Sequence, residues 1–157
     1  IHIKELPKEI GNLINLQVLN ISHTNINYLP AEIGKLTKLN TLYVNDMKLK
    51  TLPKEIGHLL ELVCIDFSMN EIEEIPREIG KLHQLKTIYA EHNCIKKLPG
   101  ELCHLSQLQP FSVKGNPFYN KYCNKSDMDE SYIIKAYLSN TYKCCMSEYG
   151  YMYAMYL

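Results

Sequence analysis

Apolar residues return along this chain at a constant spacing. Leu6, Leu29, Leu52, Ile75 and Leu98 each precede a proline, and successive members are 23 residues apart. A constant spacing of this length is typical of proteins built from stacked repeats, in which each repeat buries its apolar face only against its neighbours. We therefore interpret the chain as a solenoid.

Each repeat contains two different hydrophobic patterns. The segment Pro-x-Glu-Ile-Gly-x-Leu predicts a helical or 3₁₀ turn, because proline suits a first turn and glutamate favours a helix N-terminus. The following segment, as in Leu62-x-x-Ile65-x-Phe67, ends in strict alternation and predicts a short strand. Equivalent strands should stack in parallel, about 4.8 Å apart. The glycines are expected to relax the backbone of the turn, and Cys103 interrupts their series.

These residues resemble leucine-rich repeats of the form LxxLxLxxNxLxxLPxxIgxL, which here cover residues 1–120. The resemblance implies an α/β fold: a leucine-rich-repeat solenoid with a parallel concave sheet and helical or 3₁₀ convex turns. It also implies a ladder of buried asparagines that bond the backbone between repeats. Asn70, Asn93 and Asn116 match this ladder, whereas Thr24 and Met47 do not. We therefore expect the N-terminal half to be the looser one.

Three regions are expected along the chain. Residues 1–120 hold five repeats from Leu6 onward, preceded by a partial one. Residues 121–143 form a helical C-terminal cap, and residues 144–157 form a tail rich in Tyr and Met. Ser126 or Asp127 is expected to cap the helix, with Asp129 and Glu130 in its first turn. One face of this helix should carry Ile133, Ile134, Tyr137, Leu138 and Thr141. The first repeat should present an uncovered apolar edge, through which the chain can self-associate.

Charge and cysteine content bear on partners and location. The chain has 17 basic and 17 acidic residues, and this balance argues against direct binding of nucleic acid. No apolar run approaches the roughly 20 residues of a membrane span. Six cysteines without CxxC pairs favour reduced thiols and a cytoplasmic protein. Two glycosylation sequons, at Asn20 and Asn124, keep a secreted protein as the alternative, although Asn20 is expected on a strand.

The residues between the inward-facing aliphatic positions point out of the predicted sheet. Tyrosine and methionine are favoured at protein interfaces, and no structural rule is expected to demand the residues at these outward positions. They predict a partner-binding patch on the concave face; the alternative is a solvated sheet face. The predicted site residues are Tyr43, Asn45, Asp66, Ser68, Tyr89, Glu91 and His92.

The sequence lacks the motifs of phosphate-binding loops, acyl-transfer sites and zinc proteases. Cys103 and His104 with Cys123, Cys144 and Cys145 form a candidate zinc cluster, but no ligand pair has the spacing of a zinc finger. We therefore predict no catalytic residues, no metal site and no cofactor.

Two subfamily resemblances refine the expected function. Leu-Pro-x-Glu-Ile-Gly resembles the intracellular Ras-group repeat proteins, which implies a noncatalytic signalling scaffold that binds a small GTPase or a phosphatase. Gly115-Asn116-Pro117-Phe118, followed by residues 133–138, resembles the repeat segment of carbon-catabolite-repression deadenylases. That resemblance implies instead a segment that docks a nuclease subunit and lacks the nuclease domain of those enzymes.

Overall fold

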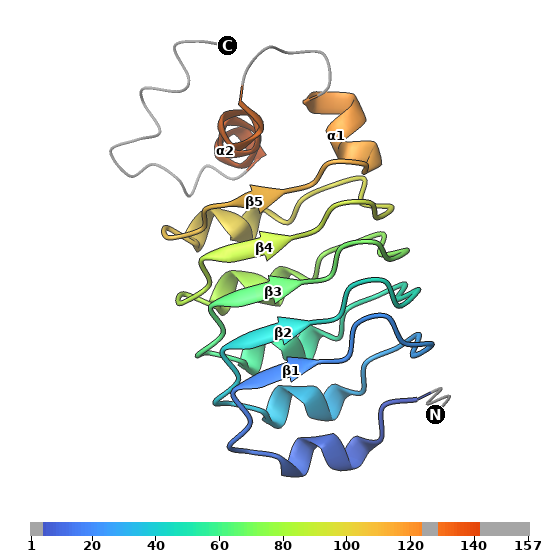
Figure 1. Ribbon diagram of the computed structural model, residues 1–157. Helices are drawn as coiled ribbons and strands as arrows, with labels where there is room; N and C mark the ends of the chain where they lie inside the picture. Colours follow the sequence, from blue (N-terminus) through green and yellow to red (C-terminus); the bar gives the residue numbers. More distant parts are fainter. Residues whose placement is uncertain (1–4, 124–128, 142–157) are drawn as a thin grey trace.

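The computed structural model describes residues 5–123 and 129–141 of the 157-residue chain. Its five parallel strands form one sheet in chain order (Figure 1). The strands are β1 (Val18–Asn20), β2 (Thr41–Tyr43), β3 (Cys64–Asp66), β4 (Thr87–Tyr89) and β5 (Phe111–Ser112). Leu19 pairs with Leu42, Leu42 with Ile65, and Ile65 with Ile88, so the repeat period is also the register of the sheet. The predicted solenoid is confirmed.

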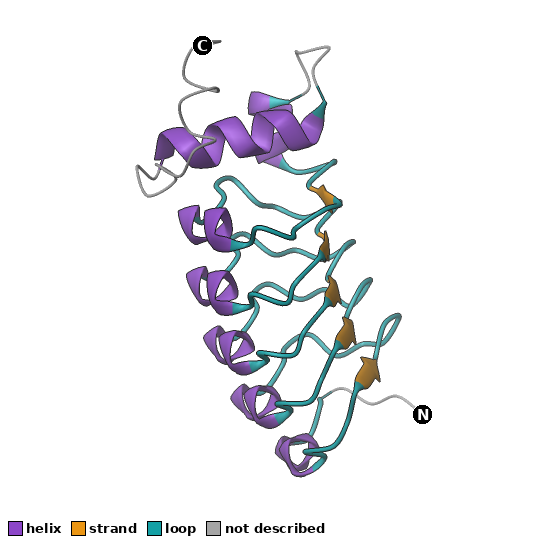
Figure 2. Cartoon of the chain, turned by 90° about the vertical axis from the view of Figure 1, so that its left-hand side faces the viewer, coloured by secondary structure: helices purple, strands orange, loops and turns teal. Residues whose placement is uncertain are grey.

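A 3₁₀ helix forms the opposite side of every repeat. These helices are η1 (Lys8–Asn12), η2 (Ala31–Lys35), η3 (Lys54–His58), η4 (Arg77–Lys81) and η5 (Gly100–His104). A proline with φ between −63° and −68° directly precedes each one, because its ring holds the backbone in the conformation that the turn requires. Figure 2 shows the 3₁₀ turns spread more widely than the strands, so the sheet lies on the concave side.

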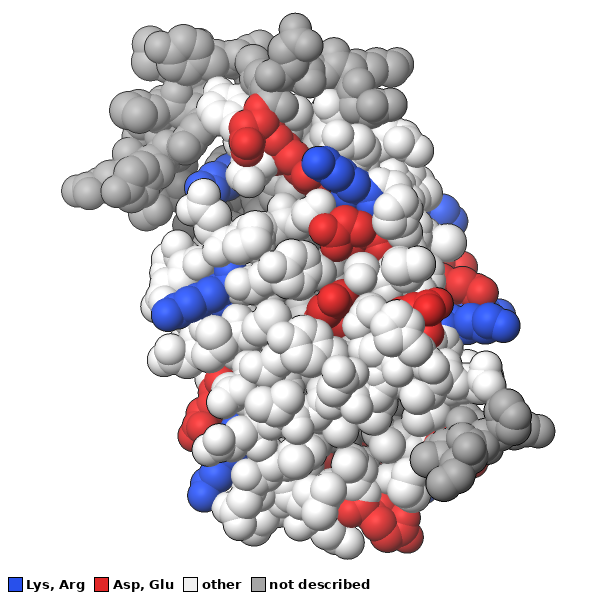
Figure 3. Space-filling view, in the orientation of Figure 1, with Lys and Arg blue, Asp and Glu red and all other residues white. Residues whose placement is uncertain are grey.

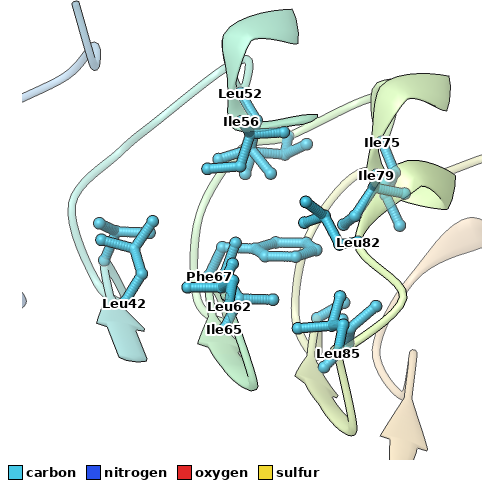
Figure 4. Packing of buried hydrophobic residues seen from close by; sticks show 14 of the residues in the cluster. Leu42, Leu52, Ile56, Leu62, Ile65, Phe67, Ile75, Ile79, Leu82 and Leu85 are labelled. Atoms are coloured by element: carbon cyan, nitrogen blue, oxygen red, sulfur yellow. The ribbon is translucent and has the colours of Figure 1, made fainter. Parts of the chain in front are cut away.

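The hydrophobic core fills the space between the sheet and the turns. Leu42, Ile65 and Ile88 from the strand centres are fully buried, as are Ile56 and Ile79 from the turns. In Figure 4, Phe67 extends its ring toward Leu82 of the following repeat. Each repeat therefore completes the core of its neighbour, as expected for a solenoid.

The glycines of the turns serve close packing, and the expectation that they relax the backbone is wrong. Gly11, Gly34, Gly57 and Gly80 do not adopt a positive φ. A Cβ atom added to Gly57 would lie 2.7 Å from the Cβ of Glu78 and 2.8 Å from its carbonyl oxygen. Adjacent turns thus approach too closely for a side chain at this position. Cys103 can interrupt the series because helix α2, rather than another 3₁₀ turn, packs on η5.

The asparagine ladder links three adjacent repeat interfaces. Asn70, Asn93 and Asn116 are all buried. The side-chain oxygen of Asn93 accepts from the Ile72 amide at 3.0 Å, and its amide group donates to the carbonyls of Phe67 and Ala90. Thr24 makes a single bond at the equivalent position, from its hydroxyl to the carbonyl of Ile21. Met47 is buried there as an apolar side chain.

Two helices follow the last strand: α1 (Pro117–Tyr122) and α2 (Glu130–Thr141). Helix α1 was not predicted and lies across the expected boundary at residue 120. Helix α2 begins at Glu130, and the Asp129 carboxylate accepts from the Ser131 amide at 2.8 Å. Asp129 is therefore the N-cap residue and not part of the first turn, while Ser126 and Asp127 lie outside the described residues.

Helix α2 covers the C-terminal end of the solenoid. It packs on η5 and β5, and Ile134 and Leu138 of its inner face are buried, as predicted. The Glu130 carboxylate accepts from the Val113 amide at 2.7 Å. In the preceding repeats the equivalent amide donates to a strand carbonyl, as from Ala90 to Ser112. Glu130 thus takes the place of a neighbouring strand, since β5 is the last strand of the described sheet. The Tyr- and Met-rich tail, residues 144–157, lies outside the described residues.

Candidate functional site

The strands present their outward side chains as rows across the concave face. The central residue of each strand from β1 to β4 is buried and its two neighbours are partly or fully exposed. Tyr43 pairs in register with Asp66, and Asp66 with Tyr89. These three predicted site residues therefore form one continuous row over β2, β3 and β4.

A second row follows the strands and has an unusual backbone conformation. His23, Asp46, Met69 and His92 have φ between 53° and 57°, and Gly115 has φ of 74°. Asp, His and Gly are among the residues that adopt this left-handed region most readily. The composition of this row is thus partly set by the backbone, which corrects the expectation that no structural rule governs the outward positions.

Met69 is the exception in that row. A long apolar side chain has no local hydrogen bond to offset the strain of a left-handed backbone, which costs roughly 1–2 kcal/mol. Its side chain is nevertheless 55% exposed. Met69 is not among the site residues predicted from the sequence. The signal that could have found it is the contrast with His, Asp and Gly in the same row.

Several predicted site residues are engaged within the face itself. The Ser22 hydroxyl bonds the side-chain oxygen of Asn45. The Ser68 hydroxyl donates to the Asp66 carboxylate at 2.6 Å. Outside the predicted set, Nδ1 of His23 lies 2.9 Å from the Asp46 carboxylate. Asn45, Asp66 and Ser68 thus shape the face, and part of their bonding capacity is already used.

Several outward side chains have no hydrogen bond or ion pair within the described part of the chain. Among them are Tyr43, Met69, Tyr89, Glu91 and His92, which we call the concave patch. Tyr89 is 37% exposed, and the His92 ring lies so close to Gly115 that a Cβ there would come within 2.5 Å of its Nδ1. The structure therefore places four of the seven predicted residues, together with Met69, on the same face with their polar groups free.

Charge is unevenly distributed over this face. In Figure 3, Asp and Glu side chains lie over the centre and upper part of the sheet, while the area in front of β1 and β2 is largely uncharged.

Burial, and secondarily the nearby Asp66 carboxylate, raises the pKa of the Cys64 thiol. Cys64 therefore stays protonated near neutral pH and is a poor nucleophile.

Cys123 is a second thiol whose pKa is raised. Burial, and secondarily Glu130, raises the pKa of Cys123 to about 11. Among residues 5–123 and 129–141, no group of three or more His, Cys, Asp or Glu side chains is placed to hold a metal ion. Cys144 and Cys145 of the candidate zinc cluster lie outside those residues. No helix in the described ranges is long and apolar enough to cross a membrane.

Comparison with known proteins identifies the repeat. A family model described as a leucine-rich repeat region matches residues 1–64. A stretch of 41 residues, 26% of the chain, is 54% identical to an Arabidopsis thaliana protein named "Probable disease resistance protein" and covers 5% of that protein. A leucine-rich-repeat protein of Leptospira interrogans is 35% identical with a TM-score of 0.72, over 74% of this chain and 30% of that one.

Two further solved structures share the fold. One is the ectodomain of the plant membrane receptor kinase GASSHO1/SCHENGEN3 from Arabidopsis thaliana, in complex with CASPARIAN STRIP INTEGRITY FACTOR 2. It is 29% identical with a TM-score of 0.65, over 71% of this chain and 14% of that one. Internalin C2 of Listeria monocytogenes is 20% identical with a TM-score of 0.65, over 72% and 48% of the two chains, and shows the fold alone.

The chain thus spans less than half the length of each of these four proteins. The similarity does not distinguish the Ras-group or deadenylase subfamilies. It agrees with the observed architecture, in which parallel strands with a 23-residue register alternate with 3₁₀ turns and an asparagine ladder. The chain is a leucine-rich repeat protein.

Proposed function

We propose that this chain is a noncatalytic module that holds a partner protein through the concave patch. One observation carries the proposal: adjacent repeats present Tyr43, Met69, Tyr89, Glu91 and His92 on one face, with no partner for these side chains in the described residues. Aromatic residues and methionine are enriched where proteins contact each other. Leucine-rich repeats generally bind proteins without catalysis, which supports the same interpretation.

The scaffold beneath the patch favours binding because it is already ordered. Backbone hydrogen bonds join each strand to its neighbours on the sheet, and Asn70 and Asn93 fix the backbone that follows β3 and β4. A partner therefore has to immobilise side chains but not the backbone, and this lowers the entropic cost of association.

Met69 supports the same assignment through its backbone. Strained conformations persist where the surrounding structure holds them and are concentrated at functional sites. Here the Met69 amide donates to the carbonyl of Glu91 at 2.8 Å, and Asn70 follows it in the ladder. The side chain held in this way is exposed and offers an apolar contact on the same face as Tyr89.

The cellular role we propose is that of an intracellular scaffold or adaptor located in the cytoplasm. Cys64, Cys94 and Cys123 are free thiols, which suits a reducing compartment. The partner class implied by the Ras-group resemblance is a small GTPase or a phosphatase. A nuclease subunit would instead favour the deadenylase resemblance.

A recognition role outside the cell is the second candidate. It is favoured by the similarity to the GASSHO1/SCHENGEN3 ectodomain, whose structure contains a bound CASPARIAN STRIP INTEGRITY FACTOR 2. Asn20, in one of the two sequons, lies at the exposed end of β1. Under this proposal the same concave patch would bind an extracellular polypeptide.

The test of the patch is capture of partner proteins by the immobilised chain and by variants. We expect the double variant Tyr43→Ala/Tyr89→Ala to lose the partner while its melting temperature changes little, because both side chains are outside the core. Met69→Asn should also weaken capture. It should leave the fold intact or slightly stabilised, since Asn tolerates a left-handed backbone better than Met.

A matched control is the double variant Lys35→Ala/Lys81→Ala, which changes two exposed residues of the 3₁₀ turns on the opposite side. This control should capture as much partner as the unmodified chain. Equal recovery by the Tyr43→Ala/Tyr89→Ala variant would refute the concave assignment. The compartment of the recovered protein then separates the cytoplasmic proposal from the extracellular one.

A further inference from the structure

An aspartate lies between two tyrosines in the row that crosses the concave face. Asp66 pairs in register with Tyr43 of β2 on one side and with Tyr89 of β4 on the other. Each of the three is an outward residue beside the buried centre of its strand. The two tyrosines are separated by two strand spacings, roughly 10 Å along the sheet. The row therefore places one carboxylate between two aromatic side chains.

Ser68 holds the Asp66 carboxylate in place and leaves one of its oxygens open. The amide and the hydroxyl of Ser68 both donate to Oδ1 of Asp66, at 2.9 Å and 2.6 Å. Within the described residues, Oδ2 accepts no hydrogen bond and the carboxylate makes no ion pair. Asp66 is also only partly exposed, which reduces screening of its charge. This carboxylate is thus oriented before a partner arrives and retains a free acceptor.

The face around Asp66 carries charge of the same sign. The outward residues of β2, β3 and β4, and of the three residues after each strand, include the carboxylates of Asp46, Asp66 and Glu91 and no lysine or arginine. Asp46 already contacts His23, whereas Glu91 is free among the described residues. Acidic side chains accordingly gather over the centre of the sheet in Figure 3. Such a surface attracts a cationic partner group and disfavours an anionic one.

We propose that the concave patch recognises an arginine side chain of the partner protein, held between Tyr43 and Tyr89 with its guanidinium on Oδ2 of Asp66. This inference rests on the proposed function and specifies the chemical group that the patch selects. A guanidinium is planar, permanently charged and weakly hydrated, so it can stack on aromatic rings and bond a carboxylate at the same time. A lysine ammonium is more strongly hydrated and has no plane to stack, so arginine is favoured over lysine.

A second copy of the chain does not supply this arginine well. Arg77 is the only arginine in the sequence, and its Nε lies 3.7 Å from the Glu78 carboxylate on η4. Because η4 is on the convex side, a copy that used Arg77 would join its convex side to the concave side of the next. Such a contact uses two different surfaces and does not close into a dimer of two equivalent contacts. The arginine is therefore assigned to a different protein.

Three short peptides test the site on the full chain. Each has blocked ends and the order glycine, leucine, X, leucine, glycine, where X is arginine, lysine or citrulline. Citrulline has the shape of arginine but a neutral urea group. Binding is followed through the amide chemical shifts of the isotope-labelled chain. We expect the arginine peptide to shift the amides of Tyr43, Asp66 and Tyr89 and to saturate. The lysine peptide should bind several-fold more weakly, and the citrulline peptide should not saturate.

A charge-neutral variant and a matched control make the result specific. Asp66→Asn keeps an oxygen for the two Ser68 bonds but removes the charge. We expect it to weaken binding of the arginine peptide about tenfold, through loss of one charge-assisted hydrogen bond at a partly exposed site. The control Glu71→Gln/Glu74→Gln removes two exposed carboxylates outside the acidic surface and should leave the affinity unchanged. Equal weakening by the control, or equal binding of the arginine and citrulline peptides, would overturn the proposal.

Partner capture separates this inference from the proposed function. Asp66→Asn should lose the same partner as Tyr43→Ala/Tyr89→Ala. A partner that the tyrosine variant loses but Asp66→Asn retains would overturn the arginine site and leave the concave patch as the binding surface. A partner that both variants retain would refute the concave assignment itself. Self-association in light scattering that Arg77→Gln abolishes would assign the site to a second copy and would also overturn the proposal.

Discussion

The two ends of this solenoid are built from the same repeat but are completed differently. At the C-terminal end, α2 covers η5, and the Val113 amide donates a hydrogen bond to the Glu130 carboxylate. At the N-terminal end, Leu13 is half-exposed and β1 has an open edge in the described sheet. The repeat motif therefore fixes the fold of each unit but not the way in which its ends are covered.

The asparagine ladder is also more complete in the C-terminal half than in the N-terminal half. Asn70, Asn93 and Asn116 bond the backbone of two repeats at once. Thr24 bonds only its own repeat, and Met47 contributes packing without a hydrogen bond from its side chain. Because solenoid stability is approximately a sum of terms within and between neighbouring repeats, we expect stability to increase from the N-terminal to the C-terminal half.

The largest expected effect comes from removing a ladder asparagine in the C-terminal half. Asn93→Ala would leave the Ile72 amide and the carbonyls of Phe67 and Ala90 without this side-chain partner. At roughly 1–3 kcal/mol for a buried group left unpaired, we expect a loss of about 3 kcal/mol in the free energy of unfolding, measured by urea denaturation.

The matched control in the N-terminal half is Thr24→Ala, which removes one bond to the Ile21 carbonyl. Its expected cost is about 1 kcal/mol. Native-state amide exchange of the unmodified chain checks the same comparison, with faster exchange expected in the first two repeats. Equal costs for the two substitutions, or faster exchange in the C-terminal repeats, would contradict the proposed gradient.

A smaller effect is expected from opening the C-terminal edge. Glu130→Ala removes the acceptor of the Val113 amide, while Glu130→Gln keeps an oxygen at that place. A hydrogen bond to a charged group contributes about 1.5–3 kcal/mol. Because Glu130 is partly exposed, we expect a loss of about 1 kcal/mol for Glu130→Ala and less for Glu130→Gln.

Amide exchange at Val113 separates local from global opening in these two variants. Glu130→Ala should speed exchange of the Val113 amide more than that of the β3 amides, and Glu130→Gln should largely restore protection. Uniform acceleration across the sheet in both variants would mean that Glu130 stabilises the cap as a whole and does not substitute for a strand.

The repeated part of the structure follows from the sequence because repetition imposes it. Paired residues of β3 and β4 are separated by the same number of residues as Leu52 and Ile75, and the asparagines predicted from the pattern are buried. The features that were missed depend on contacts outside one repeat. The bond from Val113 to Glu130 joins two residues that are 17 positions apart in the chain, and the close approach at Gly57 depends on the next turn.

The candidate site was predicted only in part, because it too depends on contacts that the pattern of one repeat does not contain. Alternation along the strands identifies which side chains face outward, and Tyr43 and Tyr89 do so. Alternation does not reveal whether an outward polar group is already bonded, as Asn45 and Ser68 are. Nor does it reveal the left-handed backbone at Met69, because that conformation arises where the strand ends and the ladder begins.

The smallest expected effect, and the one that tests the comparison most directly, is that of Met47→Asn. The substitution gives the N-terminal half the ladder residue that it lacks. In the next repeat, the Asn70 oxygen accepts from the Leu49 amide and its amide group donates to the Val44 carbonyl. By analogy, the introduced asparagine would bond the Ile26 amide and the Ile21 carbonyl. These bonds should contribute about 1 kcal/mol each, and the Ile26 amide would gain an acceptor.

The opposing effect of Met47→Asn is the loss of a fully buried apolar side chain, about 1.5–3 kcal/mol. The two new bonds together contribute about 2 kcal/mol, which is similar in size to that loss, so we expect a net change of no more than about 1 kcal/mol in either direction. Met47→Leu, which keeps apolar volume without a polar group, is the control. Slower exchange of the Ile26 amide in Met47→Asn but not in Met47→Leu would show that the ladder has been extended. Unchanged exchange in both would mean that the looseness of the N-terminal half arises from its open edge and not from the missing asparagine.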